Sequence, residues 1–137
     1  MKRVNGRVAA LLSVMLVSAA CVSTAVTKIG TSVSRPQVAP ESVVIYRTAE
    51  KVPGKYEEVA LLNSTAPTGT PWTNEEAMYR SMRVRAGAIG ANGIILDSMR
   101  EPSAGEKVAG YFLNTTVERK GKAIAIFVFP ASGGQER

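Results

Sequence analysis

The sequence contains a single cysteine, Cys21, which directly follows three small residues, Ser18, Ala19 and Ala20. The thiolate of a cysteine is a nucleophile that can be alkylated or acylated. A run of small residues is what an exported protein presents to a signal peptidase. The spacing therefore predicts that the chain is cut before Cys21 and that the sulfur of Cys21 then holds a covalent group.

Other residues with catalytic potential are few. Histidine is absent, so the usual general base near neutral pH is missing. Asp97, the one aspartate, stands beside Ser98, but this pair lacks a base that would activate the hydroxyl. Glu57 and Glu58 lie in a predicted strand and face opposite sides, so they do not form a carboxylate pair. No cluster of ligand residues suits a metal ion. We therefore expect a protein that is not an enzyme, with no catalytic residues, no cofactor and no metal.

Residues 1–20 have the order of a bacterial signal peptide. Lys2, Arg3 and Arg7 form a basic start, an apolar stretch follows, and the small residues come last. As a membrane-spanning helix, 8–20 is too short, because a bilayer core needs about 20 apolar residues.

Ser18-Ala19-Ala20-Cys21 resembles the lipobox of bacterial lipoproteins, Leu-(Ala/Ser)-(Gly/Ala)-Cys, in its last three positions. Ser18 stands where leucine is usual. The resemblance implies a diacylglyceryl group and a palmitate chain on Cys21, and hence a membrane anchor. The alternative is ordinary cleavage after Ala20, which leaves a free exported thiol. Val22 stands where inner-membrane lipoproteins have aspartate, so the sorting rule favours the outer membrane.

The charge of the chain argues against nucleic acid as a partner. Three of the 17 Lys and Arg residues lie in 1–20, and all 11 acidic residues lie beyond it, so the mature part has a formal net charge of only +3. A nucleic-acid surface would need clustered basic residues. The length fits one small domain, and a single cysteine excludes an internal disulfide.

The mature chain divides into three predicted parts. Residues 21–41, rich in Ser, Thr and Val with two prolines, indicate a flexible tether behind the lipidated N-terminus, although 22–29 could instead form an edge strand. Residues 42–130 form the folded domain, and 131–137 form a polar tail.

Within the domain, β-branched and apolar runs predict strands over 42–48, 56–62, 94–99 and 123–129. We expect 63–71 to be a turn region and 100–110 a mobile loop. The extended residues 111–129 form either a hairpin or one strand with a glycine bulge near 119–122. The order strand, strand, helix, strand, strand predicts an α+β fold, with an antiparallel or mixed sheet of four to five strands and one amphipathic helix on one face.

The predicted helix runs from about residue 74 to 89. Thr73 and Glu76 have the spacing of a capping box at its start. Gly90 suits a left-handed C-cap, and Asn92 and Gly93 form a tight exit into the next strand.

Two sets of helix residues allow a functional or a structural interpretation. Arg80, Arg83 and Arg85 could contact anionic headgroups or an acidic partner, but a solvated face is the favoured interpretation. Met78 and Met82 could line a ligand groove, but their place in the apolar stripe favours the core.

Two segments together resemble a known family. They are 43–50 followed by 54–60, and 86–96, which contains the Gly90-Ala91-Asn92-Gly93 turn before an aliphatic run. They are similar to small envelope lipoproteins related to the Rcs stress-sensor lipoprotein and to a kindred group of uncharacterised bacterial lipoproteins. The resemblance implies a lipidated cysteine, a proline-bearing tether and a strand–strand–helix–strand–strand domain, and Cys21 is the one functional residue that it carries over. The sensor's disulfides have no counterpart in this chain.

From these features we expect a lipid-anchored, non-catalytic protein of the outer membrane, whose small domain lies in the periplasm and binds or senses a component of the envelope. Its partners would be the membrane, through Cys21, and an envelope protein. The alternatives are a structural envelope lipoprotein and a soluble periplasmic binder of small ligands. An open pocket beside Met78 and Met82 would favour the small-ligand binder, and a closed core with a flat exposed sheet edge would favour a protein partner.

Overall fold

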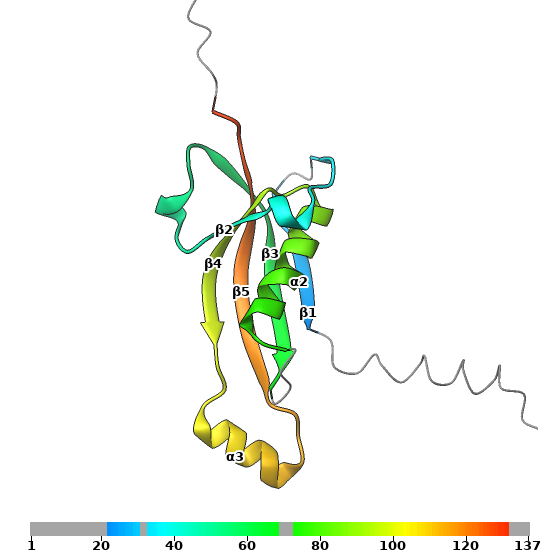
Figure 1. Cartoon of the computed structure of the whole chain (residues 1–137), viewed down its shortest axis with the longest axis vertical. Helices are drawn as coiled ribbons and strands as arrows, with labels where there is room; N and C mark the ends of the chain where they lie inside the picture. The colour runs from blue at the N-terminus through cyan, green and yellow to red at the C-terminus, as the bar shows by residue number, and fades with distance from the viewer. Residues whose placement is uncertain (1–21, 31–32, 69–72, 132–137) are drawn as a thin grey trace, which may run out of the picture.

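The structure, a computed structural model, describes residues 22–30, 33–68 and 73–131. It consists of one mixed sheet and two α-helices, so the predicted α+β class is confirmed (Figure 1). In chain order the elements are β1 (Ser23–Lys28), the 3-10 turn η1 (Pro40–Ser42), β2 (Val44–Tyr46), the 3-10 turn η2 (Ala49–Lys51), β3 (Tyr56–Pro67), α2 (Glu75–Ala88), β4 (Gly93–Arg100), α3 (Ala104–Leu113) and β5 (Glu118–Val128).

The sheet has the strand order β1-β3-β5-β4-β2. β2 and β4 are parallel, because the crossover through β3 and α2 returns the chain to the sheet in the same direction. The other neighbouring strands are antiparallel. The two longest strands, β3 and β5, lie in the middle of the sheet and provide the platform for α2.

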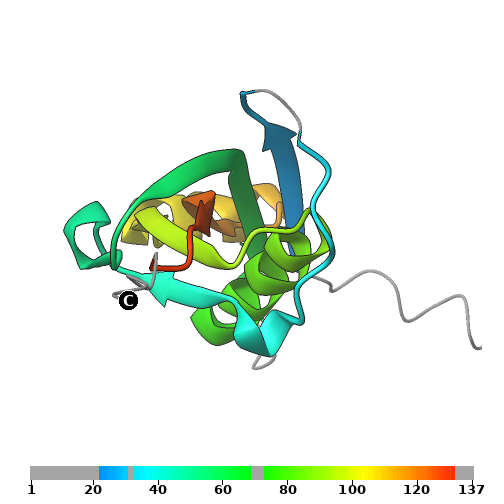
Figure 2. The same cartoon turned by 90° about the horizontal axis from the view of Figure 1, so that it is seen from above.

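The core lies between α2 and one face of this sheet (Figures 1 and 2). Apolar side chains at helical spacing on α2 meet alternate residues of the strands, as the periods of the two structures require. The fully buried large side chains here include Leu62, Met78, Met82, Ile94 and Val43. A smaller cluster of Val52, Ile95 and Ile126 packs on the other face of the sheet.

The prediction of a flexible tether over 21–41 is wrong for Ser23–Lys28, and the alternative of an edge strand over 22–29 is confirmed: β1 lies at the edge of the sheet, paired with β3. Hydrogen bonds between buried hydroxyl groups connect this strand to β3 and α2. The Thr24 hydroxyl donates to Ser64 Oγ at 3.1 Å and lies 2.7 Å from Ser81 Oγ on α2. Serine and threonine, which suggested a linker, here supply a hydrogen-bonded contact between strand and helix.

Residues 33–40 are also part of the folded body, where they run over the C-terminal end of α2 (Figure 2). The Val38 amide donates to the Gly87 carbonyl at 2.9 Å. The Arg35 guanidinium pairs with Glu57 at 2.7 Å and lies 4.7 Å from the centre of the Phe127 ring. The folded domain therefore begins at β1, well before the predicted boundary at 42.

The predicted turn region over 63–71 is wrong for its first part, because β3 continues to Pro67. Ser64 and Thr65 pair with β1 on one side and with β5 on the other. Turn-forming residue types are held in a strand here because both neighbours supply hydrogen bonds.

The region 111–129 is neither the hairpin nor the glycine-bulged strand that the sequence predicted. Its first residues end α3, and β5 then runs unbroken from Glu118 to Val128. The bulges lie on the neighbouring strands, at Val59 in β3 and at Asp97 in β4, where the pairing with β5 shifts by one residue. Gly121 forms no bulge. It leaves space for the side chain of Met99, because a Cβ at position 121 would lie 2.9 Å from Met99 Sδ.

The expected mobile loop over 100–110 is largely helix. α3 starts at Ala104, extends to Leu113 and connects β4 to β5 beyond the end of the sheet (Figure 1). Ser103 and Glu106 form the complete capping box that nucleates it, with both reciprocal hydrogen bonds present.

Candidate functional surfaces

The N-terminus of α2 differs by one residue from the prediction. Asn74, not Thr73, is the N-cap, and its side chain accepts a hydrogen bond from the Ala77 amide at 2.9 Å. The Thr73 hydroxyl donates to the Pro67 carbonyl instead, which ties the helix start to the end of β3. With Asn74 as the N-cap, Glu76 occupies N2 and not the N3 position of a capping box, and it forms an exposed ion pair with Arg80 at 3.5 Å.

The C-terminus of α2 confirms the prediction for Gly90. Its φ is +80°, and its amide donates to the Gly87 carbonyl while the next amide, of Ala91, donates to Ala86. This is the Schellman arrangement of hydrogen bonds. A Cβ on Gly90 would also lie 2.4 Å from Arg35 Cβ, so glycine is required for space as well as for conformation.

Asn92 and Gly93 join the helix to the sheet. The Asn92 side-chain NH₂ donates to the Val128 carbonyl at 2.9 Å, and Asn92 Oδ1 accepts from the Val128 amide at 2.7 Å. The side chain of Asn92 thus makes the pair of hydrogen bonds that the backbone of a neighbouring strand would make. Gly93 lies between β2 and β5, where a Cβ would be 3.0 Å from both Ile126 and Tyr46. The predicted turn residues therefore have structural roles that the structure explains.

A groove of about 450 Å³ opens between the outer side of α2 and the strands β2 and β4. It is lined by Ile45, Arg47, Glu75, Tyr79, Arg83 and Leu96. The Nε of Arg83 is buried and has no hydrogen-bond partner among the described residues. The Tyr79 hydroxyl donates to Glu75, and burial together with that carboxylate raises the pKa of Tyr79 to about 12. The groove thus combines two guanidinium groups, the carboxylate of Glu75 and a phenol that stays neutral.

The three arginines that the sequence singled out do not act as one cluster. Arg80 and Arg85 are exposed, Arg80 pairs with Glu76, and Arg83 is half-buried and lines the groove. Met78 and Met82 are fully buried, which confirms the favoured interpretation that they belong to the core.

The candidate acid and base residues are not brought together. Glu57 is half-buried and pairs with Arg35, whereas Glu58 is exposed, as strand alternation predicted. Asp97 and Ser98 are exposed at the bulge of β4. Among residues 22–30, 33–68 and 73–131, no group of three or more His, Cys, Asp or Glu side chains is placed to hold a metal ion.

A surface that the sequence analysis missed lies on α3. Val108, Tyr111, Phe112 and Leu113 are all exposed, and we call them the apolar tip. Val108, Tyr111 and Phe112 are spaced by three and four residues and so share one side of the helix. The signal that could have revealed it is Ser103 followed by Glu106, the same capping pattern that was assigned to Thr73 and Glu76.

Cys21 and the predicted signal peptide over 1–20 lie outside the described residues, as does 132–137 of the predicted tail. In the described part of the chain, none of the helices is long and apolar enough to cross a bilayer.

The sequence matches no protein-family model and no curated protein. A solved structure with a similar fold is the crystal structure of a Francisella virulence factor, FvfA, in the orthorhombic form. The two align with a TM-score of 0.55 at 11% sequence identity, over 79% of this chain and 99% of that chain. At this identity the likeness shows the fold alone: this chain shares its α+β architecture with that protein.

Proposed function

We propose that this chain is a lipid-anchored protein of the bacterial envelope, held at the outer membrane by an acylated Cys21, with a periplasmic domain that binds or senses rather than catalyses. The observation behind this proposal is Ser18-Ala19-Ala20-Cys21 at the end of a basic and apolar leader. The choice between binding and sensing stays a prediction.

The packing of the domain supports binding at its surface. Met78 and Met82 fill the core, so a ligand would have to use an outer groove or a surface. The groove beside α2 offers the guanidinium groups of Arg47 and Arg83. Arginine guanidinium groups bind carboxylates and phosphates through paired hydrogen bonds, which makes an acidic group of an envelope partner the best match.

The anchor is tested by the intact mass of the protein extracted from membranes. The expected species begins at Cys21 and includes the mass of acyl chains, and Cys21→Ser is expected to move the protein out of the membrane fraction. An unmodified Cys21 at the N-terminus of a protein found in the soluble fraction would refute the anchor.

A binder of small acidic ligands is a second candidate, favoured by the unpartnered Nε of Arg83 in the groove. Titration with inorganic phosphate and with a dicarboxylate, followed by NMR, separates the two functions. Saturable shifts at Tyr79 and Leu96 that Arg83→Ala abolishes, and that the exposed control Arg85→Ala keeps, would favour the small-ligand binder. No shifts in the groove would leave the envelope-partner function in place.

A further inference from the structure

The apolar tip of α3 is the most exposed apolar surface among the described residues. Tyr111, Phe112 and Leu113 are 85%, 80% and 71% exposed, and Val108 is 56% exposed. The rings of Tyr111 and Phe112 pack edge to face, with centroids 5.9 Å apart, so they form one unit. Large side chains gathered at this exposure mark an interaction site more often than chance.

The helix that presents the tip is well defined locally. Its capping box is extended by Arg100, which pairs with Glu106 at 2.8 Å. Asn114 ends the helix in the left-handed conformation, with φ 51°. Gly110 faces inward, where a Cβ would lie 2.3 Å from Val117 Cγ2, so the buried side of α3 is held close to the chain that follows it. These contacts fix a helix whose aromatic side chains point away from the domain.

The tip lies at the same end of the molecule as the entry of the N-terminus. Ser23, the first residue of β1, pairs with Thr65, Thr65 pairs with Lys120, and Lys120 pairs with Arg100. Neighbouring strands are about 4.8 Å apart, so this row places the start of β1 about 10–15 Å from the two strand ends that α3 connects. Cys21 is two residues before Ser23, and two residues span at most about 7 Å.

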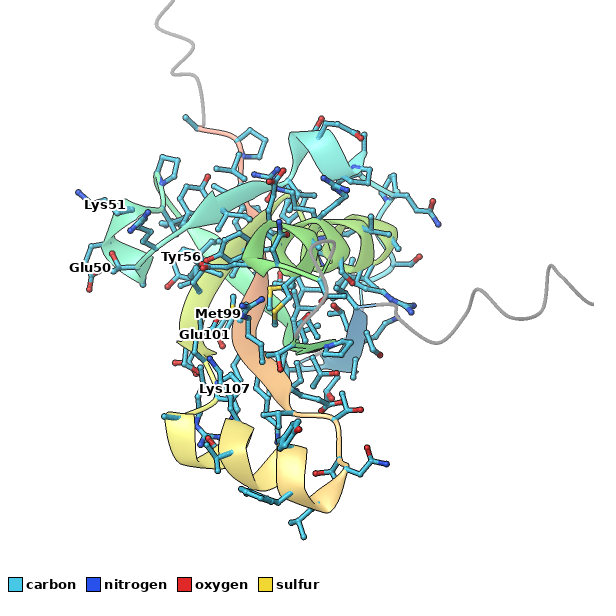
Figure 3. All side chains as sticks on the ribbon, turned by 60° about the horizontal axis from the view of Figure 1, so that its bottom comes forward. Glu50, Lys51, Tyr56, Met99, Glu101 and Lys107 are labelled. Carbon is cyan, nitrogen blue, oxygen red and sulfur yellow. The ribbon has the colours of Figure 1, made fainter. Side chains whose placement is uncertain are left out.

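Three exposed lysines lie on α3 and on the strand that follows it, at an end of the molecule that also has the carboxylates of Glu101, Glu106 and Glu118. Lys107 lies on α3, and Lys120 and Lys122 lie on the adjoining part of β5; all three are exposed and make no ion pair within the described residues. Figure 3 shows Lys107 and Glu101 where β4 passes into α3, whereas Glu50 and Lys51 lie on the distant η2 turn. Apolar side chains on one side of a helix, with basic side chains nearby, are the two features by which interfacial helices contact a membrane with anionic lipid.

We infer that the apolar tip of α3 inserts into the same membrane leaflet that holds the Cys21 anchor, and that it orients the domain with α3 toward the lipid. The inference rests on the proposed function for that anchor. Each aromatic side chain buries about 150–250 Å², so the tip offers less than the roughly 800 Å² per partner of a standard protein interface. A weak membrane contact is sufficient here, because the anchor holds the tip at an effective concentration on the order of millimolar.

The test uses tryptophan as a depth probe at two matched phenylalanines. Phe112→Trp places it in the apolar tip, and Phe129→Trp places it at the opposite end of the sheet, after the last residue of β5. Each acylated full-length variant is reconstituted into phosphatidylethanolamine/phosphatidylglycerol vesicles with and without brominated lipid. The unsubstituted protein gives the background of Trp72, the single native tryptophan.

We expect brominated lipid to quench most of the added fluorescence at position 112 and almost none at position 129, with unchanged melting temperatures. Equal quenching at both positions, or none at 112, overturns the inference. An unquenched probe at 112 together with protein dimers that Phe112→Ser dissociates would assign the tip to a second copy of the chain instead.

Failure of the anchor and failure of the insertion are distinguishable. If the mass shows Cys21 unmodified, the proposed function fails, and the free thiol is then coupled to a maleimide lipid in the same vesicles. Quenching at 112 in that sample supports insertion without the natural anchor, and its absence overturns insertion independently.

Discussion

The two helices of this domain differ in where their apolar side chains lie: those on the sheet-facing side of α2 are buried and those of the apolar tip on α3 are exposed. On α2, Met78 and Met82 are fully buried against the sheet, whereas on α3 Phe112 is 80% exposed. Both helices begin with a capping side chain and end at a residue with positive φ. The difference lies in position: α2 crosses the face of the sheet, and α3 stands beyond its end (Figure 1).

This contrast indicates that the two apolar faces have different partners. The face of α2 is covered by β3, β4 and β5 and stabilises the fold, because burial of an apolar side chain contributes about 1.5–3 kcal/mol. The face of α3 gains nothing comparable from the rest of the described chain. Substitutions in α2 should therefore change stability, and substitutions in the apolar tip should change membrane contact alone.

The largest effect is expected at the end of α2. Gly90→Val combines strain at positive φ of about 1–3 kcal/mol with overpacking against Arg35 that costs a further 1–3 kcal/mol or so. Denaturant unfolding measures the loss. Gly54→Val is the matched control, since Gly54 has φ +84° but a Cβ added there would meet nothing within 4 Å. Equal losses at both glycines would show that the packing of 33–40 over α2 is unimportant.

A direct comparison of the two apolar faces comes next. Met82→Ala removes a fully buried side chain and should cost about 2–5 kcal/mol. Phe112→Ala should change the free energy of unfolding by less than about 0.5 kcal/mol, since its side chain is mostly exposed. Chemical denaturation of both variants gives the two values. A large loss for Phe112→Ala would mean that the apolar tip is covered within the protein itself.

A smaller and local effect is expected inside α3. Gly110→Ala should push the helix away from Val117, with an overpacking cost of about 1–3 kcal/mol confined to α3. Gly105→Ala is the control, because the nearest atom to its Cβ would be Ser103 Oγ at 4.0 Å and alanine favours a helix. Amide hydrogen exchange over 104–113 should accelerate for Gly110→Ala and slow for Gly105→Ala. Identical exchange in the two variants would contradict the close packing of α3.

The smallest effect is expected at the helix N-termini, where the cap of α3 should depend on pH and the cap of α2 should not. The hydrogen bond from the Ser103 backbone, and then the contact with Arg100, lower the pKa of Glu106 from 4.5 to about 2. Because the folded pKa is depressed, the contribution of this carboxylate is complete above about pH 4.5 and is lost as the pH falls toward 2. The N-cap of α2 is the neutral amide of Asn74, which does not titrate.

NMR titration of the two capped amides checks this difference. The Ser103 amide should shift as Glu106 becomes protonated between pH 4 and about pH 2, in step with its lowered pKa. The Ala77 amide, which the neutral side chain of Asn74 caps, should show no step with this lowered midpoint. A midpoint for Ser103 near the ordinary glutamate value of about 4.3 would contradict the capping box.

The parts of the fold that the sequence predicted are those with a strong local signal. The 3.6-residue period of Met78, Met82 and Ala86 identified α2, and Gly90 marked its end within one residue. Runs of β-branched and apolar residues likewise located β4 and the second half of β5. In these elements the local preference and the tertiary contacts agree.

The errors occurred where tertiary contacts decide the structure. Thr24 and Ser64 look like linker and turn residues, but each finds hydrogen-bond partners across the sheet. Only the folded molecule shows that Gly87 leaves room for Val38. The loop assigned to 100–110 contained the capping box of Ser103 and Glu106, which Pro102, Gly105 and Gly110 obscured. The membrane anchor at Cys21 stays a prediction from sequence.

Hydrogen exchange of the two helices on a membrane tests the account most directly. The acylated protein in vesicles is compared with the Cys21→Ser protein free of lipid. Amides of α2 should exchange slowly in both samples, and amides of α3 should exchange fast without lipid and slowly in vesicles. If α3 exchanges at the same rate in both samples, the apolar tip does not contact the membrane and the central claim is wrong.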